Sequence, residues 1–127
     1  MDENELKART KQFGLRAINL VDALPKTVSG RAIGNQLVRS GTSVGANYRA
    51  ACRSRSKAEF VAKIGIVAEE ADESAFWLEL IMDANLLKTE PVSPLHKEAE
   101  ELTAIFTASG RTARINNPKS KIRNSKC

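Results

Sequence analysis

The sequence predicts an all-α protein, an antiparallel four-helix bundle with up-down-up-down topology. Apolar residues recur at alternating spacings of three and four in four successive segments, which is the period of an amphipathic helix. No segment shows the period-two alternation that is typical of a half-buried strand. The segments are joined by short connections, so consecutive helices are expected to be antiparallel neighbours.

The first predicted helix covers residues 4–24. It ends at or before Leu24, because Pro25 disfavours helical geometry in the residue that precedes it. Its apolar stripe contains one polar position. The stripe consists of Leu6, Thr10, Phe13, Ala17, Leu20 and Leu24.

The second predicted helix begins after Ser29 as N-cap and runs to about Arg53. Glycine inside a helix costs roughly 1 kcal/mol relative to alanine, so Gly41 and Gly45 indicate close packing that compensates for this cost. Two adjacent stripes predict that this helix is the most enclosed of the four. They are Ile33, Leu37, Ser40, Val44, Asn47 and Ala51, and beside them Gly34, Val38, Gly41, Gly45, Tyr48 and Cys52.

The third and fourth helices are predicted from their start signals and stripes. Ser56 and Glu59 form a capping-box pattern, and the apolar period continues to about Leu87. Ser93 as N-cap and Pro94 at the first helical position mark the start of the fourth helix. The two stripes are Phe60, Ile64, Val67, Ala71, Ser74, Leu78 and Ile81, and then Leu95, Ala99, Leu102, Phe106, Ser109 and Ala113.

Length and composition predict one bundle domain over residues 1–115, followed by a polar, basic tail over 116–127 that we expect to be disordered.

The sequence shows no secretory signal and no apolar run long enough to span a membrane, so a cytoplasmic protein with no membrane partner is expected. Cys52 and Cys127 are expected to be free thiols, because two cysteines make no disulfide framework and lack metal-type spacing.

Charge is segregated along the chain. The net charge is +5, with a balance of +6 over residues 31–63, −8 over 64–101 and +6 over 102–127. The up-down-up-down topology places both termini and the turn between helices two and three at one end. That basic end is a candidate for binding nucleic-acid phosphates. Its predicted contact residues are Arg49, Arg53, Arg55, Lys57, Arg111, Arg114, Lys119, Lys121, Arg123 and Lys126.

Catalytic patterns are missing from the sequence, and we expect no enzyme, no cofactor and no metal site. The only histidine, His96, falls in the first turn of the fourth helix, where exposure is expected, and no nucleophile–base pair or metal cluster can be assembled around it from the sequence. The acidic residues at 69, 70, 72 and 73 are interpreted as a solvated or salt-bridged face, since no Glu-x-x-His pattern accompanies them.

The stretch from Arg39 to Phe60 carries a resemblance to a known family. Gly-Thr-Ser-Val-Gly-Ala-Asn-Tyr-Arg at 41–49, Arg-Ser-Lys-Ala-Glu-Phe at 55–60 and Ile-Gly-Ile at 64–66 resemble the signature of the four-helix bundle proteins encoded by 23S rRNA intervening sequences. Glu73 matches a helix-three glutamate of that family, whereas Ala75 stands where a second glutamate is often found. The resemblance implies a cyclic homo-oligomer, commonly a pentamer. A related protein is the accessory protein of diversity-generating retroelements, which binds nucleic acid and a reverse transcriptase.

Several motif residues are assigned structural or oligomer roles. Arg39 is expected to pair with Glu69 and Glu73 across the hairpin. Asn47 is interpreted as a buried amide that bonds to a neighbouring helix, with a binding role as the alternative. Tyr48 is expected either to fill the gap beside Gly41 and Gly45 or to pack against a second copy. Trp77, off the main stripe, forms either an edge of the core or a contact to another subunit.

These observations leave two functional hypotheses. The first is a non-enzymatic homo-oligomer that binds RNA or DNA through its basic end without strong sequence preference. Aromatic residues are scarce, so such binding is expected to address the backbone rather than the bases. The second is a protein-interaction scaffold, or an accessory subunit for a partner such as a reverse transcriptase.

Overall fold

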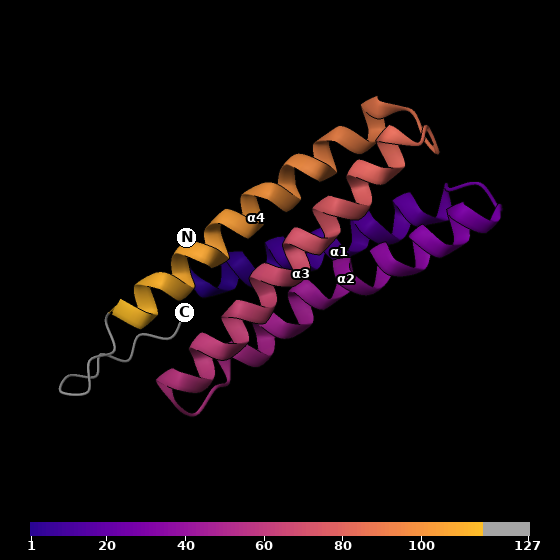
Figure 1. Cartoon of the computed structure of the whole chain (residues 1–127). Coiled ribbons are helices and arrows are strands. Elements are labelled where there is room, and N and C mark those ends of the chain that lie inside the picture. The colour runs from indigo at the N-terminus through magenta and orange to yellow at the C-terminus, as the bar shows by residue number, and fades with distance from the viewer. Residues whose placement is uncertain (116–127) are drawn as a thin grey trace.

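The computed structural model describes residues 1–115 of the chain, which form four α-helices. They are α1 (Glu3–Asp22), α2 (Val28–Cys52), α3 (Lys57–Asp83) and α4 (Thr89–Ile115), and residues 1–115 contain no strand. Successive helices run antiparallel, so the start of α1, the α2–α3 turn and the end of α4 lie at one end of the bundle (Figure 1). The predicted all-α four-helix bundle is confirmed. The predicted tail lies outside the described residues.

Helix α1 starts with a capping box that the sequence analysis did not identify. The Asp2 carboxylate accepts a hydrogen bond from the Glu5 backbone N–H at 2.8 Å, and the Glu5 carboxylate accepts one from the Asp2 backbone N–H at 2.9 Å. The helix ends at Asp22, two residues earlier than the predicted boundary. The N-cap of α2 is Thr27 rather than Ser29, because the Thr27 hydroxyl is the group that accepts from a free backbone N–H, that of Gly30.

The connection between α3 and α4 differs most from the prediction. Helix α3 begins after Ser56 as predicted, but it ends at Asp83, and Asn85 follows in the left-handed region with φ of 56°. Asparagine tolerates this conformation better than most residues, which explains the early stop. Helix α4 starts at Thr89 rather than after Ser93. Pro91 is accommodated because the N–H groups of a first turn have no intrahelical partner, whereas Pro94 lies inside the helix.

Helix α2 is enclosed by α1 on one side and α3 on the other, as its two stripes predict. The glycine stripe faces α1: a β-carbon added at Gly41 would lie 2.8 Å from Ala17 Cβ, and one at Gly45 would lie 3.3 Å from the Thr10 carbonyl oxygen. The other stripe, which begins at Ile33, supplies Leu37 and Val44 to the central core, where both are fully buried. Helix α3 shares the central position, because it packs against both α2 and α4.

Helices α1 and α4 pack against each other less extensively than helices that are consecutive in the chain. A cluster of ion pairs, which we call the charged clamp, joins them and consists of Arg9, Glu98 and Glu101. The Arg9 guanidinium donates to Glu98 through Nε at 2.6 Å and Nη2 at 2.8 Å, and Nη2 also donates to Glu101 at 2.8 Å. Hydrogen bonding to Glu98, followed by its charge and the contact with Glu101, raises the pKa of Arg9 despite partial desolvation. The sequence pattern gave no signal for this clamp.

Candidate functional site

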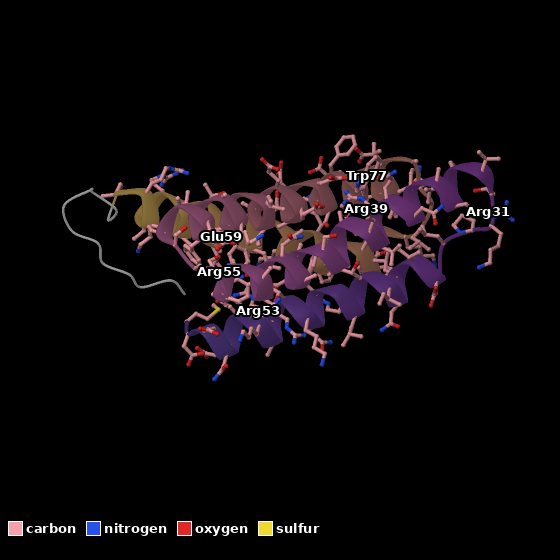
Figure 2. All side chains as sticks on the ribbon, turned by 90° about the horizontal axis from the view of Figure 1, so that it is seen from below. Arg31, Arg39, Arg53, Arg55, Glu59 and Trp77 are labelled. Carbon is pink, nitrogen blue, oxygen red and sulfur yellow. The ribbon has the colours of Figure 1, made fainter. Side chains whose placement is uncertain are left out.

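The structure gathers the predicted basic residues at one end of the bundle. Arg49 lies in the last turn of α2, and Arg53 and Arg55 lie in the turn that follows it. Arg111 and Arg114 lie in the final turns of α4, which reach the same end (Figure 1). Figure 2 shows Arg53 and Arg55 together at this end and Arg31 at the opposite end, near the start of α2. Substitution of Arg31 can therefore serve as a control for substitutions of the arginines at the basic end.

The arginine side chains at this end are available to an anionic partner. All five arginines are exposed, and none of them has an ion pair within residues 1–115. Lys57 begins α3 and is half-buried. The remaining predicted contacts lie outside the described residues; they are Lys119, Lys121, Arg123 and Lys126.

Acidic groups near this end are partly used by the fold. Glu59 Oε1 accepts a hydrogen bond from the Arg55 backbone N–H at 2.6 Å. In the predicted capping box, Glu59 would instead accept from the backbone N–H of the N-cap residue, Ser56. Glu3 pairs with Lys7 at 2.8 Å. These carboxylates therefore cancel some of the local positive charge while leaving the Arg53 and Arg55 guanidinium groups unpaired.

An apolar groove with a basic rim lies between α1 and α2 beside this end. Its lining includes Gly14, Leu15, Ile18, Thr42 and Gly45, and Leu15 and Ile18 are among the exposed large apolar residues. The cations on its rim are Lys7, Lys11 and Arg49. The two lysines were not predicted as site residues from the sequence. Their spacing of four residues places them on one face of α1, but only the position of α2 shows that this face borders a groove.

A polar cluster links α2 and α3 near mid-bundle. Arg39 Nη2 donates to Glu73 at 2.6 Å and Nη1 to Glu70 at 3.2 Å, and Trp77 Nε1 donates to the same Glu73 oxygen at 3.0 Å. The predicted Arg39–Glu73 pair is confirmed, but the second partner is Glu70 rather than Glu69. Glu70 and Glu73 both contact Arg39, whereas Glu69 is exposed and has no ion pair within residues 1–115. The hydrogen bonds from Arg39 and then Trp77 lower the pKa of Glu73.

Trp77 forms an edge of the core, one of its two predicted roles. The side chain is half-buried against the core cluster, and its ring meets Phe76 edge-on at a centroid distance of 5.1 Å. Phe76 itself is 50% exposed. The face of α3 that carries these rings is therefore both apolar and, through Glu69 and Glu73, acidic.

Two predictions for α2 are wrong. The Asn47 side chain is half-buried and does not bond to a neighbouring helix. Its Nδ2 donates to the Ser43 carbonyl of its own helix at 2.9 Å, a local side-chain-to-backbone bond. Tyr48 neither fills the glycine gap, which Ala17 and Thr10 occupy, nor faces a second copy. It is 1% exposed, and its ring lies 5.2 Å from that of Phe106, so it fills the bundle centre between α2 and α4.

A polar contact at the centre of the core was not predicted from the sequence. The Ser40 and Ser74 hydroxyl oxygens lie 2.8 Å apart, and both residues are fully buried. Ser74 also donates to the Glu70 carbonyl at 2.9 Å. The pair joins the two central helices, and each hydroxyl also lies within hydrogen-bond distance of a carbonyl of its own helix, so both buried groups are satisfied.

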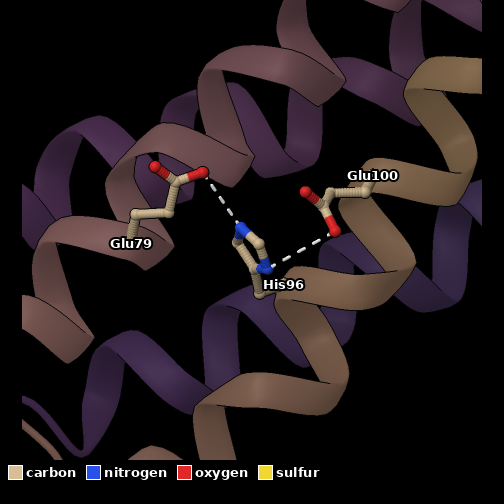
Figure 3. A group of neighbouring side chains, drawn as sticks. All are labelled: Glu79, His96 and Glu100. Atoms are coloured by element: carbon tan, nitrogen blue, oxygen red, sulfur yellow. Dashed lines mark hydrogen bonds and ion pairs between the residues drawn. The ribbon is translucent and has the colours of Figure 1, made fainter.

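The structure brings His96 into a cluster, contrary to the expectation that it is exposed and isolated. Its side chain is 18% exposed, and Nε2 lies 3.0 Å from Glu79 Oε2 of α3. On the other side of the ring, Nδ1 lies 3.8 Å from Glu100 Oε1, one turn further along α4 (Figure 3). The sequence could not pair residues 79 and 96, because their contact depends on the register of α3 against α4.

Within residues 1–115 no helix is both long and apolar enough to cross a membrane. No curated protein matches the chain. Among solved structures, the chain is similar to a protein of unknown function from the S23 ribosomal protein family of Bacteroides thetaiotaomicron VPI-5482. The two are 30% identical with a TM-score of 0.80, and the match covers 87% of this chain and 99% of the other. The family model described as 23S rRNA-intervening sequence protein matches residues 2–108. The chain therefore belongs to the 23S rRNA-intervening sequence protein family.

Proposed function

We propose that the protein is a non-enzymatic homo-oligomer that binds RNA or DNA through its basic end, with little sequence preference. The observation that carries this proposal is the set of exposed, unpaired arginines at 53, 55, 111 and 114, which two separate segments bring to one end. Exposed guanidinium groups suit phosphate oxygens, which are the same for every sequence.

The distribution of aromatic residues supports backbone recognition over base recognition. Tyr48, Phe60 and Phe106 are buried in the core, and none of the described residues at the basic end offers an exposed ring for base stacking. Affinity then comes from phosphate neutralisation and counterion release, and it falls steeply with salt.

Self-association is supported by two surfaces that complement each other in polarity. The α1–α2 groove combines Leu15 and Ile18 with a basic rim, whereas the outer face of α3 combines Ile66 and Phe76 with Glu69. The surfaces differ, so a contact between them would be heterologous and would close into a ring under cyclic symmetry. A ring, which we expect to be a pentamer, would repeat the basic end around one rim.

A protein-interaction scaffold is the second candidate, and the exposed Phe76 and Ile66 favour it. In that case the acidic, apolar face of α3 would bind a different protein, such as a reverse transcriptase, instead of a second copy. Size measurement by light scattering distinguishes the two, because the scaffold hypothesis does not require the free protein to self-associate.

The test of nucleic-acid binding uses the full, tag-free chain and labelled duplexes of several unrelated sequences. We expect similar affinities for all of them at low salt, with log K falling by about 0.9 per phosphate neutralised for each tenfold rise in salt. A chain ending at residue 115 should show a smaller slope and an unchanged oligomer, because it lacks the cations at 119, 121, 123 and 126. Absence of binding at low salt by the intact protein would overturn the proposal and leave the scaffold as the better hypothesis.

A further inference from the structure

We propose that Glu79, His96 and Glu100 form a binding site for a divalent transition-metal ion, with Zn²⁺ as the ion of best fit. One imidazole nitrogen and one oxygen from each carboxylate lie within 4.8 Å of one another (Figure 3). Donors around tetrahedral zinc bind at about 2.0–2.2 Å, which places neighbouring donors roughly 3.3 Å apart. The 3.0 Å contact between His96 and Glu79 already has a comparable spacing.

The remaining adjustment falls on the side chain that is freest to move. Glu100 is 62% exposed, and its Oε1 lies 3.8 Å from Nδ1, across the ring from the Nε2 that contacts Glu79. An ion held at Nε2 therefore requires Glu100 to change its rotamer, which its exposure allows without disturbing the core. The ring itself is held: its side chain is 18% exposed and it lies between two helices. A half-buried ligand whose orientation is fixed by packing lowers the entropy lost when an ion binds.

The cluster combines one imidazole with two carboxylates, all of which are ligand types that transition metals accept. Glu79 Oε2 lies 3.0 Å from Nε2 of His96, and Glu100 Oε1 lies 3.8 Å from Nδ1. An ion in this cluster would accept the lone pair of one ring nitrogen, and the two carboxylates would neutralise its charge.

The imidazole decides which ions the site selects. Carboxylates alone suit Mg²⁺ and Ca²⁺, whereas an imidazole nitrogen favours Zn²⁺ and related transition metals. Three protein donors leave a tetrahedral ion with one position for water. Because Glu79 belongs to α3 and His96 to α4, the ion would also tie these helices together near their connection.

The test uses the fact that His96 is the only histidine, so its ring resonances in NMR report on this site alone. In tag-free protein at neutral pH, Zn²⁺ should shift these resonances at concentrations where Mg²⁺ has no effect. Glu79→Gln and Glu100→Gln should each weaken zinc binding by at least about tenfold, since loss of even a supporting group near a metal typically costs 10–100-fold. Zinc should also raise the thermal midpoint of the unmodified protein more than that of Glu79→Gln.

The matched control is Glu69→Gln, which removes the same charge from an exposed position on α3 without touching the cluster. It should bind zinc as the unmodified protein does. Ring resonances that do not respond to Zn²⁺ would overturn the proposal, as would equal affinities in Glu79→Gln and Glu69→Gln. An equal response to Mg²⁺ and Zn²⁺ would also contradict it, because that outcome indicates non-specific attraction of cations to the carboxylates rather than coordination by the imidazole.

Discussion

Gly41 of α2 faces Ala17 of α1 so closely that a β-carbon at position 41 would lie 2.8 Å from the Ala17 methyl group. That methyl group is attached directly to the backbone, so it cannot rotate away and the two helices would have to separate. The Gly41–Ala17 contact therefore sets the spacing of the α1–α2 pair. It also explains why a glycine is retained inside α2 despite its helix propensity.

Gly41→Leu is expected to lower the free energy of unfolding by about 1–3 kcal/mol, because overpacking a tight contact forces backbone shifts. Gly65→Ala is the matched control: position 65 is also helical, but an added β-carbon there meets nothing within 4 Å. This control should gain about 0.8–1 kcal/mol from helix propensity. Urea unfolding of both variants measures the difference, and equal stability of Gly41→Leu and the unmodified protein would show that α1 does not pack as described.

Arg9→Gln should loosen the α1–α4 edge. The substitution removes the guanidinium group that donates two hydrogen bonds to Glu98, whose side chain is 16% exposed. We expect the free energy of unfolding to fall by about 1 kcal/mol. Hydrogen exchange should rise in α1 and α4 more than in the central pair α2 and α3. Arg16→Gln removes a cation from the same helix that has no ion pair within residues 1–115, and it should have little effect. Uniform loss of protection across all four helices would contradict a local role for Arg9.

The Arg39–Glu73 pair gives stability a specific dependence on pH. Because Arg39 and Trp77 lower the pKa of Glu73, its contribution is fully present above the unfolded pKa, about 4.3, and is lost as the pH falls through the folded value. Glu73→Gln should therefore be less stable than the unmodified protein at pH 7, by about 0.2–1 kcal/mol for this half-exposed pair. The gap should shrink once Glu73 is protonated in the folded protein. A gap that stays constant in acid would assign the effect to packing.

Self-association, if it uses the two complementary surfaces, should depend on the apolar residues that each surface exposes. Leu15→Asp and Phe76→Asp should each reduce the mass measured by light scattering toward the 13.9 kDa of one chain. Val28→Asp is the control, because Val28 is 85% exposed but lies outside both surfaces at the start of α2. A single-chain mass for the unmodified protein at micromolar concentration would refute the proposed ring.

The fold could be predicted from the sequence because its periodicity is strong and its breaks are marked. Gly41 and Gly45 indicated a close helix contact before any partner was known, and Ser56 marked the start of α3. The helix ends were less accurate where competing signals were present. At α4, Ser93 and Pro94 suggested a late start, yet the helix begins at Thr89. Pro91 is tolerated there because the N–H groups of a first turn have no intrahelical partner.

The candidate site was predictable only in part. Arg53 and Arg55 could be placed because a turn and antiparallel topology fix their end of the bundle. The contacts made by Arg9, His96 and Tyr48 could not, since each depends on the register and tilt of helices that are far apart in the chain. For Asn47, a contact between helices was predicted where the structure has a local one. Its place on a predicted stripe suggested a bond to a neighbouring helix, but its side chain bonds to the Ser43 carbonyl one turn earlier in the same helix.

The proposed function is tested most directly by comparing charge reversal at the two ends of α2. Arg53→Glu combined with Arg55→Glu alters the basic end, whereas Arg31→Glu alters an exposed arginine at the opposite end (Figure 2). Fluorescence anisotropy with labelled RNA and DNA duplexes at two salt concentrations gives the affinity and its salt dependence. The double variant should bind every sequence more weakly and with a flatter salt slope, while Arg31→Glu should bind much as the unmodified protein does. Equal loss in both variants, or no loss in the double variant, would contradict binding at the basic end.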